Sequence, residues 1–315
     1  MVLVAAGLGT LVAPSSSVAE DARDRVKVAL VAMHSEMGRP EENLARVAEF
    51  CDKAHAAGAT FVVFPEECLT GSLNKSNLSE AEQAKAVASA DKLAIARLTE
   101  IARKNRQTLI VGTILRDGEK YRNAALVVGP DGPLATFSKL WLPNKNEERF
   151  FRAGNELPVV QSQGWQFSVG ICADLNRGEY FDAASRAGAE MFLLPVAGSG
   201  MGEVVGANGD QTKQADEHRK LHEPIMRDWG RQYAIYVGYA NQAGHSGNDW
   251  FPGLSLAVDP RGELMAAHAP TEGMLVVEVS RDVLKQARAA LKRSATAPEI
   301  KNSSGQPVRI LRVGK

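Results

Sequence analysis

Residues 26–64 read VKVALVAMHSEMGRPEENLARVAEFCDKAHAAGATFVVF, two apolar runs with an amphipathic segment between them. The runs at 26–33 and 60–64 are short and rich in β-branched residues, which is typical of buried strands. Between them Pro40 suits a first helical turn, and Gly58 ends the helix. Four apolar residues fall at helical spacing in this segment: Leu44, Val47, Cys51 and Ala54. The stretch therefore predicts a strand–helix–strand unit, the building block of an α/β protein.

The same patterns continue along the chain. We predict further helices at 79–105, 179–187 and 214–232, and further strands at 108–113, 122–128, 134–138, 166–171, 190–195, 233–239, 254–258, 264–267 and 274–279. Strands alternate with helices in the first half and cluster as hairpins elsewhere, which indicates an α/β layered domain with mixed sheets. We place this single domain at residues 24–315. Its polar tail from Ser294 is expected to run over the surface or onto a partner.

Residues 1–23 have a different composition. Residues 2–13 are apolar and small, and Ser17 and Ala19 precede the first charge at Glu20, as before a signal-peptidase site. No Lys or Arg precedes the apolar run, so a disordered or helical extension is the alternative. The run is too short for a membrane span. This pattern predicts an exported protein, periplasmic or secreted, with no span in the mature chain; a cytoplasmic protein is the alternative.

Charge and cysteine content argue against several functional classes. Lys plus Arg and Asp plus Glu both number 37, so the formal net charge is zero and nothing favours a nucleic-acid partner. A small-molecule substrate is expected instead. The chain has 3 cysteines, an odd number that does not form a disulfide framework, and no CxxC pair suggests zinc.

Three segments place reactive residues at the ends of predicted strands: FPEECLTG at 64–71, FSKLWLP at 137–143 and VGICAD at 169–174. Glu66 follows a buried strand directly, at the rim of a sheet where sites are built. Lys139 is flanked by apolar residues and would need an anionic partner if buried. Cys172 lies where an apolar strand meets a polar loop, whose amides could point at a ligand. Taken singly, each residue has a plainer interpretation, as a solvated acid, a surface lysine and an inert buried thiol.

In this order and at this spacing, the three segments resemble the nitrilase superfamily of carbon–nitrogen hydrolases, in its amidase-like branch. The resemblance runs from Val26 to Val279 and implies a four-layer α-β-β-α sandwich with two mixed β-sheets. It implies Glu66 as general base, Lys139 as the group that stabilises the oxyanion, and Cys172 as nucleophile. Glu147, in the run E-x-R-F-F-x-x-G, matches a second glutamate that positions substrate.

Other positions near these segments bear on the substrate. The resemblance implies Ala173 and Glu179 as substrate-binding residues, with Glu148 as the alternative to Glu147. Relatives often have an aromatic residue or Asn where this chain has Ala173, and Pro where it has Gly178. The pair Ala173–Asp174 favours amidases and carbamoyl-amide hydrolases over nitrilases.

The resemblance implies a hydrolase that cleaves a non-peptide C–N bond of a small linear amide or N-carbamoyl compound. A cysteine thioester would form and ammonia or an amine would leave, with no cofactor and no metal. The alternatives are a nitrilase that converts R–C≡N to an acid, and a non-catalytic binding protein on the same fold. Relatives commonly pair, and the tail has four apolar residues that a lone surface segment would not need, so we expect a homodimer or a higher homo-oligomer. They are Val308, Ile310, Leu311 and Val313.

Two other kinds of site, a metal centre and a serine triad, have little support in the sequence. His218 and His222 stand one helical turn apart, with Glu217 and Glu223 adjacent, a spacing that could hold a metal. A solvated face is the favoured interpretation, because the helix is charged. A serine triad is not supported, because no G-x-S-x-G elbow occurs.

Overall fold

The computed structural model describes residues 24–199, 211–246, 249–268 and 271–314. The expected signal segment at 1–23 lies outside this part, as does most of the Gly-rich stretch at 198–209. No helix within the described ranges is long and apolar enough to cross a membrane.

The first sheet has the order β14-β1-β2-β3-β4-β5. The neighbours of β2 run parallel to it, and the other pairs are antiparallel, so the sheet is mixed. Its strands are β1 (Arg25–Ala32), β2 (Phe61–Val63), β3 (Thr108–Asp117), β4 (Lys120–Gly129), β5 (Gly132–Ser138) and β14 (Gly273–Ser280).

The second sheet has the order β13-β12-β9-β8-β7-β6-β15 and is also mixed, with β7, β8 and β9 parallel. Its strands are β6 (Glu156–Ser162), β7 (Trp165–Val169), β8 (Met191–Val196), β9 (Tyr236–Asn241), β12 (Leu256–Val258), β13 (Leu264–Ala267) and β15 (Arg309–Val313). A separate hairpin consists of β10 (Ala243–Ser246) and β11 (Asp249–Pro252).

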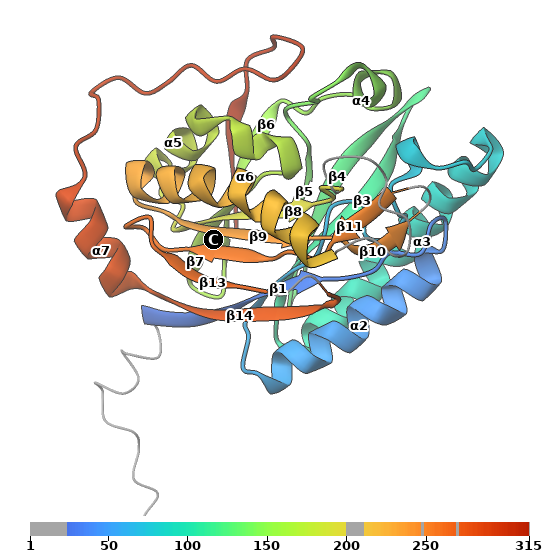
Figure 1. The fold of residues 1–315 in the computed structure, drawn as a ribbon, viewed down its shortest axis with the longest axis horizontal. Coiled ribbons are helices and arrows are strands. Elements are labelled where there is room, and N and C mark those ends of the chain that lie inside the picture. Colours follow the sequence, from blue (N-terminus) through green and yellow to red (C-terminus); the bar gives the residue numbers. More distant parts are fainter. Residues whose placement is uncertain (1–23, 200–210, 247–248, 269–270, 315) are drawn as a thin grey trace, which may run out of the picture.

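The two sheets pack face to face, with helices outside (Figure 1). Between the sheets the rings of Phe61 and Phe167 meet edge to face, with their centroids 5.4 Å apart. Helices α2 (Pro40–Ala56) and α3 (Glu80–Asn105) cover the outer face of the first sheet, and α5 (Gly178–Arg186) and α6 (Gln211–Tyr233) cover the second. The predicted four-layer α-β-β-α sandwich is confirmed.

Local sequence signals account for the helices that were predicted. In α2, Pro40 occupies the first turn and the four apolar residues at helical spacing are buried. In α3, Ser79 and Glu82 form a capping box, in which the Ser79 N–H donates to Glu82 Oε2 at 2.8 Å. Both helices therefore begin at, or next to, the residues that the sequence predicts.

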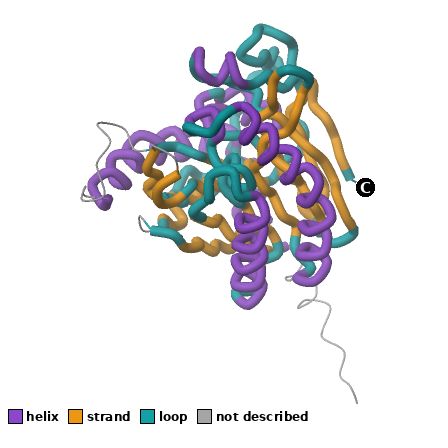
Figure 2. The backbone as a smooth tube through the Cα atoms, turned by 90° about the vertical axis from the view of Figure 1, so that its right-hand side faces the viewer, coloured by secondary structure: helices purple, strands orange, loops and turns teal. Residues whose placement is uncertain are grey.

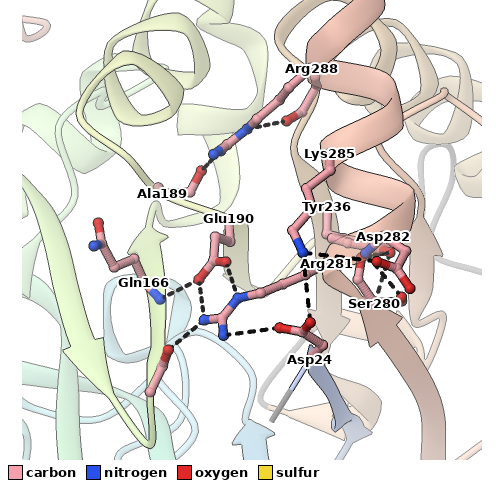
Figure 3. A network of polar contacts seen from close by, with 12 residues as sticks. Asp24, Gln166, Ala189, Glu190, Tyr236, Ser280, Arg281, Asp282, Lys285 and Arg288 are labelled. Carbon is pink, nitrogen blue, oxygen red and sulfur yellow. Dashed lines mark hydrogen bonds and ion pairs between the residues drawn. The ribbon is translucent and has the colours of Figure 1, made fainter. Parts of the chain in front are cut away.

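A polar network joins the layers at the start of β8 (Figure 3). Arg281, the first residue of α7 (Arg281–Ala290), donates to Glu190 Oε1 at 2.7 Å and lies 3.7 Å from Asp24. Glu190 also accepts the Gln166 N–H at 2.8 Å. The Arg281 guanidinium stacks over Trp165, 4.3 Å from the ring centroid. The network ties α7 and the first strand to the second sheet.

The expectation for the tail was wrong at 309–313. These residues form β15, which pairs parallel with β6 at the edge of the second sheet, near the C-terminus in Figure 2. The apolar residues of the tail pack onto the two clusters that cover this sheet, on its outer and inner faces. They are used inside the chain, so they no longer argue for a partner, and the oligomer stays a prediction. Also unpredicted were α4 (Lys145–Phe150), α7, β6, β10, β11 and the short 3₁₀ turns η1 (Leu73–Lys75) and η2 (Cys172–Asn176).

Candidate active site

Glu66 lies just beyond β2, at the end of the parallel strands of the first sheet, and its side chain is buried. The backbone of Pro65–Glu67 crosses directly over Gly112 of β3. A Cβ built on Gly112 would lie 2.2 Å from the Pro65 carbonyl oxygen and 2.6 Å from the Glu66 Cα. Only glycine leaves room for this crossing, so Gly112 sets the height of Glu66 above the sheet.

Four groups from separate segments hold Glu66. Asn123 Nδ2 donates to Glu66 Oε1 at 2.7 Å, and the Ala197 N–H donates to Oε2 at 2.7 Å. Gln242 Nε2 donates to the Glu66 carbonyl at 2.7 Å. Lys139 Nζ lies 2.9 Å from Oε1. A carboxylate held by three donors, on a backbone held by a fourth, has a fixed orientation.

Lys139 is buried between two carboxylates. Its Nζ lies 2.9 Å from Glu66 Oε1 and 2.8 Å from Glu147 Oε2, and 1% of its side chain is exposed. The Lys139 N–H donates to the Asn123 carbonyl, and the Lys139 carbonyl accepts the Gly154 N–H, both at 2.8 Å. Lys139 thus has the anionic partners that a buried lysine needs.

Glu147 reaches Lys139 from the first turn of α4, which is capped by Asn144. The Asn144 Oδ1 accepts the N–H of Glu147 at 3.0 Å. Its neighbour Glu148 is exposed, and its carbonyl accepts from Lys120 Nζ at 2.6 Å. Of the two candidate glutamates, Glu147 is the one at the site.

Cys172 begins η2, after β7, and has φ = 47° in the left-handed region. Such a conformation costs a non-glycine residue roughly 1–3 kcal/mol and persists only where the surroundings impose it. Asp174 supplies part of that constraint. Its carboxylate accepts the N–H of Ile171 at 2.9 Å, of Trp141 at 2.7 Å and of Leu140 at 3.4 Å. Asp174 therefore ties the turn of the cysteine to the segment that follows Lys139.

The charges of the site favour a neutral thiol beside an ionised carboxylate. Burial raises the pKa of Cys172, and the negative charge of Glu66 raises it further, against the opposing effect of Lys139. Burial alone would raise the pKa of Glu66, but the charge and hydrogen bond of Lys139 outweigh it and hold that pKa low. For Lys139, burial opposes the charged form, and the surrounding anions raise its pKa well above the usual value. The resting groups are thus a thiol, a carboxylate and an ammonium.

A second carboxyl lies next to the first. Glu67 is buried with φ = 55°, and its Oε1 accepts from Asn123 Nδ2 at 3.1 Å. Burial, and then the charge of Glu66, raise the pKa of Glu67 to about 8. Burial likewise raises the pKa of Asp174 to about 7, against its hydrogen bonds from the backbone. Sequence reasoning gave neither group a role in the site.

The other predicted residues lie at different distances from this centre. Ala173 is buried directly after Cys172. Glu179 pairs with Arg177, whose guanidinium lies 4.0 Å from the Trp141 ring centroid. Among the described contacts, Glu179 makes none with Glu66, Lys139 or Cys172.

The remaining cysteines do not share the position of Cys172. Cys51 is buried in the core under α2. Cys68 is also fully buried, and its thiol donates to the Gly112 carbonyl at 3.3 Å. Both are packed as small apolar residues.

The solvated face expected for the histidines of α6 was wrong for His218, which is 3% exposed. It packs against Gly198 and His222, the latter with ring centroids 4.2 Å apart. The nearby Glu223 pairs with Arg219 at 2.6 Å. In the described ranges no three acidic, histidine or cysteine side chains are grouped so that they could hold a metal ion.

The model of the carbon–nitrogen hydrolase family matches residues 27–289. The chain belongs to the carbon–nitrogen hydrolase family. This hydrolase is 25% identical over 268 residues to an (R)-stereoselective amidase from a Pseudomonas species, covering 84% of this chain and 88% of the relative. It is 27% identical over 263 residues to the chloroplastic omega-amidase of Arabidopsis thaliana, covering 80% of this chain and 67% of the relative.

A solved structure shows the same similarity to amidases. The amidase from Nesterenkonia sp. AN1, with acrylamide added at its active-site cysteine, is 25% identical and superposes with a TM-score of 0.68. The match covers 84% of this chain and 97% of the amidase. Family, fold and relatives together identify an amidase-like member of the nitrilase superfamily.

Sequence reasoning missed the residues that support the site of this hydrolase. Gly112 had a readable signal, because a glycine inside a strand marks close approach of another backbone. Asn123 and Gln242 had none, because a polar residue in a strand gives no indication of which carboxylate it will meet. Asp174 was noted only in the pair Ala173–Asp174 that favours amidases, and its carboxylate was given no structural role.

Proposed function

We propose that this chain hydrolyses small linear amides or N-carbamoyl compounds through a thioester on Cys172. The observation that carries the proposal is Lys139, buried between Glu66 and Glu147 at 2.9 Å and 2.8 Å. A buried ammonium with two carboxylates is costly to maintain for stability alone. It is useful where a negative charge must be stabilised during a reaction.

In the first half of the proposed reaction, the sulfur of Cys172 attacks the amide carbon while its proton passes to Glu66. The carbonyl oxygen becomes an oxyanion, stabilised by Lys139 Nζ and the backbone N–H of Ala173. Protonated Glu66 then donates to the nitrogen, the C–N bond breaks, and ammonia or an amine leaves. The acyl group remains on sulfur as a thioester.

In the second half, Glu66 takes a proton from water, whose oxygen attacks the thioester carbon. The C–S bond breaks, protonated Glu66 returns its proton to the sulfur of Cys172, and the acid leaves. Glu147 holds Lys139 in place and lies where it can orient the substrate amide. The low pKa of Glu66 supports its role, because a base must be ionised before it can accept a proton.

The test is ammonia release from a panel of primary amides, N-carbamoyl compounds and nitriles, measured for the wild type and Cys172→Ala. We expect turnover of amides or N-carbamoyl compounds by the wild type and none by the variant. Turnover of nitriles alone would instead make this chain a nitrilase. Binding without turnover of any compound would favour a non-catalytic protein and contradict the proposal.

Glu66→Gln tests the base separately. The variant keeps the shape of the side chain but accepts no proton, so we expect the acylation step to stall. A pre-steady-state experiment with excess substrate should show no burst of ammonia. A normal burst followed by slow turnover would mean that Glu66 acts only in deacylation.

A further inference from the structure

Two buried polar side chains near the segment that holds the proposed base have no role in the mechanism above. Tyr239, in β9, is fully buried on the face of the second sheet that α6 covers, and His218 comes from α6 itself. Their rings lie with centroids 6.3 Å apart. His222 lies beside both, 4.2 Å from His218 and 5.5 Å from Tyr239.

Gly198 connects this pair to the catalytic centre. A Cβ built on Gly198 would lie 2.6 Å from His218 Nε2 and 3.4 Å from the Tyr239 hydroxyl oxygen. The preceding residue, Ala197, donates its N–H to Glu66 Oε2 at 2.7 Å. The two side chains thus lie against the segment that holds the proposed base. The pKa of Tyr239 agrees with this position: burial raises it first, and electrostatic interactions with Cys172 and Glu66 raise it further.

Both side chains have an unused polar atom. Among the described residues, neither Tyr239 Oη nor His218 Nδ1 has a hydrogen-bond partner, and both atoms are buried. Leaving a buried polar atom unpaired costs about 1–3 kcal/mol, so native proteins rarely keep two together without a reason. A bound substrate that supplies the missing partner removes the cost.

The pair is polar but carries no charge. Burial, and then the neighbouring His222, lower the pKa of His218 to about 3, so its imidazole is neutral near pH 7. His222 donates its Nδ1 proton to the His218 carbonyl at 2.8 Å, because a carbonyl can only accept. Lys139, the cation beside Cys172, is already shared by Glu66 and Glu147. Within the described ranges no cation contacts this pair, so a substrate carboxylate would find no positive charge at these two side chains, whereas a neutral donor or acceptor would find two partners.

We propose that His218 and Tyr239 bind a neutral hydrogen-bonding group, such as a hydroxyl, on the acyl part of the substrate. This inference rests on the proposed function and narrows its substrate class. The preferred amides carry a polar, uncharged acyl chain, in place of a plain aliphatic chain or one that ends in a carboxylate. The two residues are specificity determinants and take no part in proton transfer.

The test compares matched pairs of amides that differ only in a hydroxyl or a methyl group. One pair is 3-hydroxypropanamide and butanamide, and shorter and longer pairs are built in the same way. For each pair, kcat/KM is measured in the wild type and in Tyr239→Phe, and the ratio of hydroxy to methyl substrate is compared. A ratio within one variant cancels any loss of folded enzyme.

We expect the wild type to favour the hydroxy amide by about tenfold or more in at least one pair, because sites with buried polar groups reject analogues that leave those groups unpaired. Tyr239→Phe and His218→Leu should each lower that ratio about tenfold, and His218→Asn, which keeps a polar atom near the Nδ1 position, should restore part of it. Tyr180→Phe is the matched control. Its hydroxyl donates to the Lys301 carbonyl at 2.7 Å, away from the site, so its removal should leave the ratio unchanged.

Equal kcat/KM for hydroxy and methyl amides in every pair would overturn the inference, as would a preference that survives Tyr239→Phe and His218→Leu. A higher kcat/KM for succinamic acid, the carboxylate analogue, would also overturn it. The failure of the proposed function has a different signature, namely no ammonia from any amide. In that case calorimetry of the same pairs with Cys172→Ala still tests the binding preference, and equal affinities for both members would overturn it.

Discussion

Replacing Gly112 with alanine is the smallest change that tests how the proposed base is positioned. The added Cβ would lie 2.2 Å from the Pro65 carbonyl oxygen and 2.6 Å from both Glu66 Cα and Glu67 N, whereas ordinary contacts begin at 3.4 Å. All three atoms belong to the backbone, so no side-chain rotation relieves the overlap. The Pro65–Glu67 segment must therefore move by about 1 Å, a misplacement that can cost an enzyme about 10²-fold in rate.

We expect Gly112→Ala to lower kcat/KM for ammonia release about 10²-fold. Overpacking of this kind also costs about 1–3 kcal/mol of stability, which a urea midpoint measures. Gly129→Ala in the neighbouring strand is the control, because its Cβ would meet side chains and no backbone, with Leu134 at 3.2 Å and Ser162 Oγ at 3.6 Å. That variant should keep nearly full kcat/KM. If Gly112→Ala also keeps the wild-type kcat/KM, the crossing over Gly112 does not set the position of Glu66, and the reasoning fails.

Three further predictions use the same two assays. Cys172→Ser should lose orders of magnitude in activity with the fold intact, because the hydroxyl is far less acidic than the thiol. Cys68→Ala should keep substantial turnover. If Cys172→Ser keeps its activity and Cys68→Ala loses it, Cys172 is not the nucleophile. Lys139→Ala removes a charged donor worth about 2.7–4 kcal/mol to the oxyanion, so kcat should fall about 10²- to 10³-fold; a kcat within tenfold of wild type would exclude that role. Glu190→Ala removes the partner of Arg281 at the opposite end of β8 from Ala197, so it should cost about 1–3 kcal/mol of stability and leave kcat/KM unchanged; a loss of kcat/KM would show that the two ends are coupled.

The parts of the fold that sequence predicted are those whose signals are local. The unit at 26–64 has apolar residues at strand and helix spacing, with Pro40 at the start of the helix and Gly58 after its end. Both strands and the helix are observed. β15 has no such signal, because it is a short strand in a polar tail whose partner, β6, lies far away in sequence. An edge pairing of this kind depends on the finished sheet.

The candidate site likewise contains residues that the sequence indicated and residues that it did not. Glu66, Lys139 and Cys172 each follow a predicted strand, but these strands are β2 and β5 of the first sheet and β7 of the second. No local signal brings them together, so the sequence grouped them only through the resemblance to the nitrilase superfamily. His218 was misread because its neighbours in α6 are charged. Its burial comes from contact with Gly198 and Tyr239, which the helix sequence does not encode.

The neutral resting thiol has a practical consequence for chemical probes. Alkylating reagents and peroxide react with the thiolate, and burial raises the pKa of Cys51, Cys68 and Cys172 alike. At neutral pH the folded chain should therefore react slowly with maleimides and peroxide, which do not resemble an amide substrate, and the buried Cys51 and Cys68 should become reactive only on unfolding. A probe shaped like an amide, with a weak electrophile at the carbonyl or beside it, would recruit Glu66 to remove the proton as it binds. Covalent labels for Cys172 should accordingly be chosen for their likeness to a substrate and not for their intrinsic reactivity.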